Sequence, residues 1–371
     1  MALARNAAVV RKYQTQGIEF AIHGYRHIDH SQLSVEEQNA HFQKAIQIFA
    51  EEGIDCKGFR CPYLRWNEAT LAALSQNGLA YDSSNSLVWA IDQRHCTDSY
   101  YRALEFYGAQ PASDYLALPK FNAGQNLVRI PYCLPDDESL IERLIWDSPA
   151  EMNQVWPTMF QEIHQRGELF NLGLHPERTY DCADSLEATM RQVQAVATEV
   201  WRAPLKEIAT WWKNRYQAEV EITDVETNKF RLTVNGPPGA TVLLRSVESH
   251  TATKPWFDGY QQAVESPCLI QTNKRPFIGI SPASSPDLTS FLKQQGYIVE
   301  ISSQADLYPF YLDRPTFSPE QEQPLDAEIN RGSFPLVRLG RWPNGAKSAF
   351  CVTGDIDAIT VWDYGLRFVG Y

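Results

Sequence analysis

The stretch Ile22-His23-Gly24-Tyr25-Arg26-His27 follows a short apolar run, Ile18 to Ile22, whose composition predicts a buried strand. Two imidazoles four residues apart at the end of a strand can bind one divalent metal ion, and neutral imidazole suits zinc, iron, cobalt or nickel. A catalytic metal usually takes a third protein ligand and keeps one position open for water. The histidine pair therefore predicts a metal site if the chain supplies a third ligand, and a purely structural pair if it does not.

Short apolar segments alternate with helical patterns over the first 216 residues. The patterns predict strands at residues 18–22, 58–60, 79–81, 127–130 and 169–174. They predict helices at residues 3–15, 34–52, 67–77, 149–166, 183–201 and 207–216, the second opened by a capping box from Ser34 to Glu37. Such alternation is typical of parallel α/β units.

The pattern changes near Ala218, where residues alternate with a period of two. Residues 217–315 are expected to form a small β-rich domain that also contains a strand–helix–strand unit at 277–301. Residues 316–348 are rich in Pro, Glu and Gln and are expected to be a linker. Residues 349–371 are expected to add a buried strand and a short helix that complete the first domain, residues 1–216.

Composition limits the class of protein. A chain of 371 residues is long for one domain, and its formal charge of −12 argues against a nucleic-acid or anionic-membrane partner. No apolar run approaches the roughly 18–20 residues of a membrane span, and the first residues do not resemble a signal peptide. Seven scattered cysteines without a C-x-x-C motif are typical of reduced thiols, so a cytoplasmic location is expected. The oligomeric state is left open.

Polar residues follow several of the predicted strands, at the ends where α/β folds place their sites. These residues are His23, His27, Arg60, Asp82 and His175. Each has an ordinary alternative: Arg60 could pair with a structural carboxylate, Asp82 could cap a turn, and His175 before a proline could simply end a strand. Together, and in this order, they form a more specific pattern.

Four motifs, in this order along the chain, resemble those of the polysaccharide deacetylases, the NodB-homology group of carbohydrate esterases. They are His23-x-x-x-His27, Arg60-Cys-Pro-Tyr63, Asp82 and Leu172-Gly-Leu-His175. The resemblance covers roughly residues 2–216 and the last 25 residues. It implies an α/β fold, a distorted and incomplete (β/α) barrel of about seven strands. It also implies a metal-dependent hydrolase that removes an acetyl group from an N-acylated sugar or polysaccharide.

The first motif of that family, an aspartate at a strand end, should precede His23, but no suitable aspartate does. The missing motif resembles Thr353-Gly-Asp355-Ile-Asp357 near the other end of the chain. Two explanations remain open. The domain is circularly permuted, and the late strand lies beside the early ones. Alternatively, the chain lacks the N-terminal part of the domain, and the late strand belongs to something else.

The resemblance implies a metal site made by His23, His27 and Asp357. The expected cofactor is a divalent metal, zinc in the first instance, with iron, cobalt or nickel as alternatives. The substrate would be a carbohydrate or a small N-acyl compound. The alternatives are a glycan-binding relative without turnover, a truncated inactive fragment, and a hydrolase of small amides similar to allantoinase.

The resemblance also implies roles for five further residues. Asp355 would be the general base, Arg60 would orient it and keep it ionised, and the backbone N–H of Tyr63 would stabilise the oxyanion. His175 would be the general acid that protonates the leaving amine, and Asp82 would orient His175.

Overall fold

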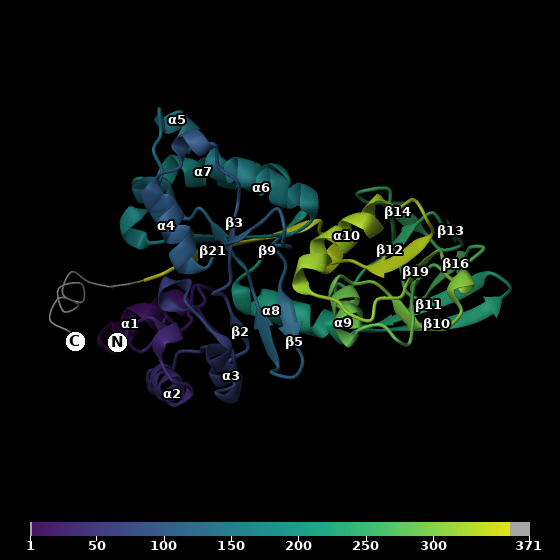
Figure 1. Ribbon diagram of the computed structural model, residues 1–371, viewed down its shortest axis with the longest axis horizontal. Helices are drawn as coiled ribbons and strands as arrows, with labels where there is room; N and C mark the ends of the chain where they lie inside the picture. Colours follow the sequence, from purple (N-terminus) through teal and green to yellow (C-terminus); the bar gives the residue numbers. More distant parts are fainter. Residues whose placement is uncertain (1, 357–371) are drawn as a thin grey trace.

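The computed structural model describes residues 2–356, and its secondary structure alternates as expected in the first part of the chain (Figure 1). The α-helices of the described chain are α1 (Ala2–Gln14), α2 (Val35–Glu51), α3 (Glu68–Gln76), α4 (Asp98–Tyr107), α5 (Pro149–Met152), α6 (Val155–Arg166), α7 (Ala183–Ala195), α8 (Leu205–Tyr216), α9 (Pro286–Gln294) and α10 (Glu322–Arg331). The expected capping box is confirmed, because Ser34 accepts from the Glu37 N–H and the Glu37 carboxylate accepts from the Ser34 N–H.

Two sheets form the α/β unit that carries the polar strand ends. Their orders are β1-β2-β6-β5 and β4-β3-β7-β8-β21-β9, and every pairing is parallel except β5 with β6. Ile22 extends the first sheet by a single parallel bridge to Phe59. The strands are β1 (Gly58–Phe59), β2 (Tyr81–Asp82), β3 (Ser86–Val88), β4 (Gln110–Pro111), β5 (Lys120–Asn122), β6 (Leu127–Arg129), β7 (Tyr132–Leu134), β8 (Leu169–Leu174), β9 (Val200–Arg202) and β21 (Ser348–Gly354).

Strand β21 lies inside this unit although it is the last strand of the described chain (Figure 1). It pairs in parallel with β8, from Ala349 opposite Leu169 to Gly354 opposite Leu174, and its first residues pair with β9. Residues 348–351 are buried. The late strand therefore lies beside the early ones, in the arrangement that the permutation hypothesis requires.

A second group of sheets, two of them antiparallel and one parallel, forms the β-rich unit. The antiparallel sheets have the orders β10-β11-β16-β13 and β14-β15-β12-β20, and the parallel sheet has the order β18-β17-β19. The strands are β10 (Glu219–Glu226), β11 (Lys229–Asn235), β12 (Val242–Arg245), β13 (Glu248–Ser249), β14 (Thr253–Pro255), β15 (Gln261–Ala263), β16 (Cys268–Gln271), β17 (Ile278–Ile280), β18 (Val299–Ile301), β19 (Phe310–Leu312) and β20 (Leu336–Leu339).

One hydrophobic core joins the two units. The fully buried rings of Trp212 on α8 and Trp342 after β20 lie with their centroids 5.3 Å apart. The same cluster contains residues of both units, Leu169 and Ile278 among them. The indole N–H of Trp342 donates to the carbonyl of Gly167 at 3.0 Å, so the buried polar edge of the ring is satisfied. The β-rich unit is therefore packed against the α/β unit rather than tethered to it.

The segment expected to be a linker is structured. Residues 316–348 contain α10, and β20 pairs with β12 in register from Leu336 to Leu339. Leu325 and Ile329, four residues apart, are buried on one face of α10. The prediction of a linker is therefore corrected. The segment is polar and contains prolines, but the two apolar residues on one face of α10 are enough to attach this helix to the core.

Two further expectations differ in detail. The helix expected over 183–201 ends at Ala195, because residues 200–202 pair with β21 as strand β9. The strands of residues 2–356 form five sheets and no closed barrel.

None of the helices in the described range is both long and apolar enough to cross a bilayer.

Candidate active site

The histidine pair lies directly after the bridge of Ile22 to the first sheet. The two rings of His23 and His27 have centroids 5.2 Å apart, and the Nδ1 atom of His23 lies 3.0 Å from the carbonyl oxygen of Arg60. Gly24 makes the turn between them with a positive φ of +87°, and a Cβ at this position would lie 2.7 Å from the Arg26 carbonyl oxygen. A residue with a side chain is therefore strained at the position that brings the second histidine back to the first.

Arg60 and Asp355 form an ion pair between the two ends of the chain. One guanidinium nitrogen of Arg60 lies 2.9 Å from an Asp355 carboxylate oxygen, another donates to the Thr353 hydroxyl at 3.0 Å, and Nε donates to the Ser83 carbonyl at 3.1 Å. Arg60 is only 6% exposed, and its guanidinium also lies over the ring of Tyr132. These contacts orient both charged groups.

The environment of Asp355 favours its ionised form. Its backbone N–H donates to the Leu174 carbonyl, so the pairing of β21 with β8 places it. Burial alone would raise its pKa, but the charges of Arg60, His23 and His175, with the hydrogen bond from Arg60, lower that pKa to about 2. The carboxylate is therefore charged at any pH above this value.

His175 pairs with Asp137, a residue that the sequence patterns did not single out. The Nδ1 atom of His175 lies 2.8 Å from one Asp137 oxygen, and its backbone N–H donates to the other. Burial lowers the pKa of His175, but the hydrogen bond and charge of Asp137, with the charges of Asp355 and Asp136, raise it to about 9. Asp137 follows the end of β7, so the rule that picked out the other strand ends also applies to it.

Asp82, expected to orient His175, makes different contacts. Its carboxylate accepts from the Ser84 hydroxyl and lies 3.9 Å from the Arg129 guanidinium, and the Ser84 oxygen accepts from the Cys61 N–H. Asp82 is fully buried, and burial raises its pKa. The contact with His175 is made by Asp137 instead, because Asp137 follows β7, which pairs with the strand β8 that precedes His175, whereas Asp82 supports the loop after Arg60.

Tyr63 lies next to the histidine pair. Its backbone has a positive φ of 59°, in the left-handed region that non-glycine residues rarely adopt. Its ring meets the ring of His27 edge to face with centroids 4.5 Å apart. The unusual backbone conformation is of the kind that concentrates at functional sites.

The donor set of the histidine pair fits a divalent metal. Because a carbonyl only accepts, the Nδ1 atom of His23 that faces the Arg60 carbonyl carries the hydrogen, and Nε2 keeps its lone pair. This arrangement fixes the tautomer of a metal-binding histidine. The predicted third ligand, Asp357, lies outside the described residues, so the structure describes only the two imidazoles of the predicted set.

Comparison with known proteins supports the sequence resemblance. Residues 2–81 match the family model described as polysaccharide deacetylase. The match covers less than a quarter of the chain, and it is to the family that the sequence motifs resemble. The matched segment contains the histidine pair and Arg60.

One similar solved structure comes from Mycobacterium smegmatis and is of a protein assigned to the polysaccharide deacetylases. It is 21% identical over 56% of this chain and 67% of its own, with a TM-score of 0.43. No curated protein matches the chain.

Proposed function

We propose that the protein is a metal-dependent hydrolase that removes an acetyl group from an N-acetylated sugar or polysaccharide. The observation that carries the proposal is the Arg60–Asp355 ion pair, with His23 and His175 close enough to Asp355 to lower its pKa. A carboxylate held ionised and an imidazole held protonated form a base and an acid for amide cleavage. We also propose that the two sheets of the α/β unit represent the incomplete barrel, of about seven strands, that the family resemblance implies.

The metal would be held by His23, His27 and Asp357. Two imidazoles and one carboxylate suit zinc, with iron, cobalt and nickel as alternatives. When bound, such an ion polarises the substrate carbonyl and lowers the pKa of a water molecule.

Asp355 would take the proton of the attacking water. Its low pKa means that the carboxylate is charged and free to accept at neutral pH. Arg60 would keep the carboxylate pointing at the reacting centre through the 2.9 Å contact. The oxygen of water then bonds to the acyl carbon, and the backbone N–H of Tyr63 would stabilise the negative charge that develops on the carbonyl oxygen.

His175 would donate the second proton. The carbon–nitrogen bond breaks as the imidazolium gives its proton to the leaving amine, and the products are acetate and a free amine. A pKa of about 9 keeps the ring protonated at neutral pH, and the buried Asp137 carboxylate holds it in one orientation.

Acetate release from oligomers of N-acetylglucosamine tests the proposal. The variants Asp355→Asn and His175→Ala are each expected to lose about 10²–10⁴-fold in kcat/KM, the usual contribution of a general acid or base. His250→Ala is the matched control, because His250 is exposed on the β-rich unit and its ring bonds the Gln271 side chain, away from the proposed catalytic residues.

Full activity in either active-site variant would contradict the proposed roles. Binding of the same oligomers with no acetate release from the wild type would instead favour the glycan-binding alternative. Release from a small amide but not from the sugars would favour the allantoinase-like one.

A further inference from the structure

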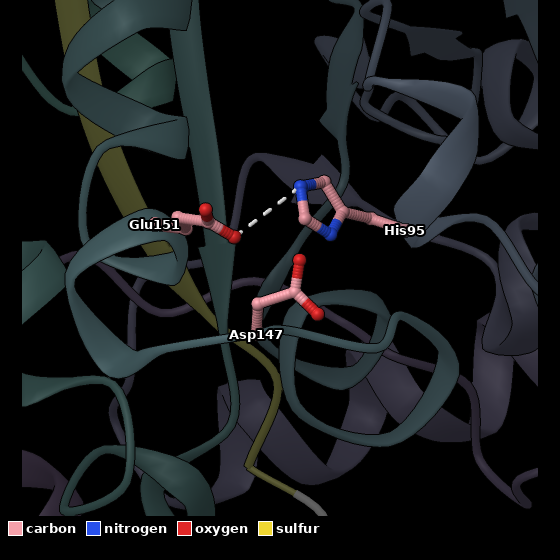
Figure 2. A group of neighbouring side chains, drawn as sticks. All are labelled: His95, Asp147 and Glu151. Carbon is pink, nitrogen blue, oxygen red and sulfur yellow. Dashed lines mark ion pairs between the residues drawn. The ribbon is translucent and has the colours of Figure 1, made fainter.

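A second group of potential metal ligands consists of residues outside the proposed catalytic set. His95 ends the short helix η3 (Gln93–His95), Asp147 precedes α5, and Glu151 lies within α5. One candidate ligand atom from each residue lies within 4.8 Å of the other two. Figure 2 shows the three side chains pointing toward one another from these separate segments.

The ring of His95 is held so that one nitrogen faces the carboxylates. Its side chain is 6% exposed, and its Nδ1 atom lies 2.8 Å from the carbonyl oxygen of Ile145. Because a carbonyl only accepts, Nδ1 carries the hydrogen in the neutral ring, and Nε2 presents a lone pair. The indole of Trp146 packs on the ring at a centroid distance of 4.6 Å. Nε2 is therefore a preoriented ligand atom.

The Glu151 oxygen that faces Nε2 of His95 accepts no hydrogen bond from the described residues. Oε2 of Glu151 lies 3.6 Å from Nε2 of His95, and it is buried with no hydrogen-bond partner among the described residues. Two acceptor atoms that face each other in a buried place require a positive species between them, because an unsatisfied buried carboxylate oxygen is costly. A proton on Nε2 or a metal ion could meet that requirement.

The local charge favours a cation at this place. Asp92, Asp147 and Glu151 surround Arg94, whose guanidinium lies 3.2–3.4 Å from all three carboxylates. Three negative charges and one positive charge leave a net charge of −2 beside His95. Arg94 contacts the other oxygen of Glu151, Oε1, so Oε2 stays available.

We propose that His95, Asp147 and Glu151 bind a divalent transition-metal ion. One imidazole nitrogen and two carboxylate oxygens suit zinc, cobalt or manganese. The ion would tie η3 to α5 at the edge of a pocket of ≈ 490 Å³, lined by His95, Glu151, Trp89, Trp146 and neighbouring residues. Three protein ligands leave at least one coordination position open, as in metal sites that bind a further small ligand.

Cobalt binding to the full chain tests this site separately from the proposed catalytic one. The background is His23→Ala/His27→Ala, which removes the imidazoles of the catalytic proposal. After chelator treatment, this variant is expected to bind about one equivalent of Co²⁺ by equilibrium dialysis and to show the visible absorption of protein-bound cobalt. Adding Glu151→Gln, which keeps the shape of the side chain, is expected to weaken that binding at least tenfold.

Glu162→Gln in the same background is the matched control. Glu162 lines the same pocket and pairs with Arg166, but it is not one of the three proposed ligands. It is expected to leave cobalt binding unchanged. Absence of cobalt binding in the background variant would overturn the proposal. Equal binding with and without Glu151→Gln would overturn it as well.

Discussion

Replacing Asp137 by asparagine is expected to lower the pKa of His175 while leaving the ring in place. The asparagine side chain would still offer an acceptor oxygen but would no longer carry the buried negative charge that lies 2.8 Å from Nδ1. The pKa of His175 stands at about 9, against 6.5 for an ordinary histidine, although burial opposes that rise. A difference of about 2.5 corresponds to about 3 kcal/mol in favour of the imidazolium.

The expected fall in the pKa of His175 is about 1–3, the usual effect of one nearby opposite charge. Proton NMR of the histidine Cε1–H signal across pH 5–10 measures it directly in the full chain. If His175 is the general acid, it must be protonated, so the rate of acetate release falls as pH rises through its pKa. The alkaline limb of the kcat/KM profile should therefore move to lower pH by the same amount as the NMR titration.

Asp136→Asn is the control for the neighbouring charge. The Asp136 carboxylate bonds the Tyr132 hydroxyl and the Ser139 N–H rather than His175, and its charge is the weakest of those that raise the pKa of His175. A smaller fall in the pKa of His175 is expected in Asp136→Asn. An unchanged pKa of His175 in Asp137→Asn, or an equal fall in the two variants, would refute the reasoning. A lower pKa of His175 without a change in the pH dependence of kcat/KM would show that His175 is not the general acid.

Three further outcomes are expected. The pKa of Asp355 in the folded protein, about 2, lies below the ordinary value of 3.8. Its ion pair with Arg60 should therefore contribute about 2 kcal/mol of stability above pH 3.8, and this contribution should be lost as the pH falls toward 2. Urea unfolding should show this acid dependence in the wild type and not in Asp355→Asn. Trp212→Ala should lower the free energy of unfolding in urea by about 3–5 kcal/mol, because the ring is fully buried where the two units meet. Asp357→Ala should reduce the metal retained at the histidine pair, measured by plasma mass spectrometry; unchanged metal content would exclude it as the third ligand.

The residues that the sequence revealed share one property, because each follows a strand that local patterns predict. His23, Arg60 and His175 come directly after Ile22, β1 and β8. No local pattern marks Asp137, because β7 has only three residues. The sequence therefore favours Asp82 as the partner of His175, because Asp82 follows a segment with a clearer strand pattern.

The pairing of strands could not be predicted in the same way. The apolar run that starts at Ala349 predicts a buried strand, but a strand pattern does not encode its neighbours. That β21 lies between β8 and β9 depends on contacts between residues that are far apart in the chain. The same limit explains the linker prediction, since α10 and β20 are stabilised by the shared core rather than by a strong local pattern.

The position of β21 makes the proposed active site depend on the fold of the whole described chain. Arg60 and Asp355 are 295 residues apart in sequence, and Arg60 is buried almost completely. Without Asp355, the guanidinium would remain in the interior with no carboxylate of residues 2–356 in contact, a situation that usually costs about 3–5 kcal/mol. Loss of the late strand would therefore destabilise the α/β unit as well as remove the proposed base. This energetic link, with the position of β21 between β8 and β9, is the physical reason to regard β21 as an integral strand of the α/β unit.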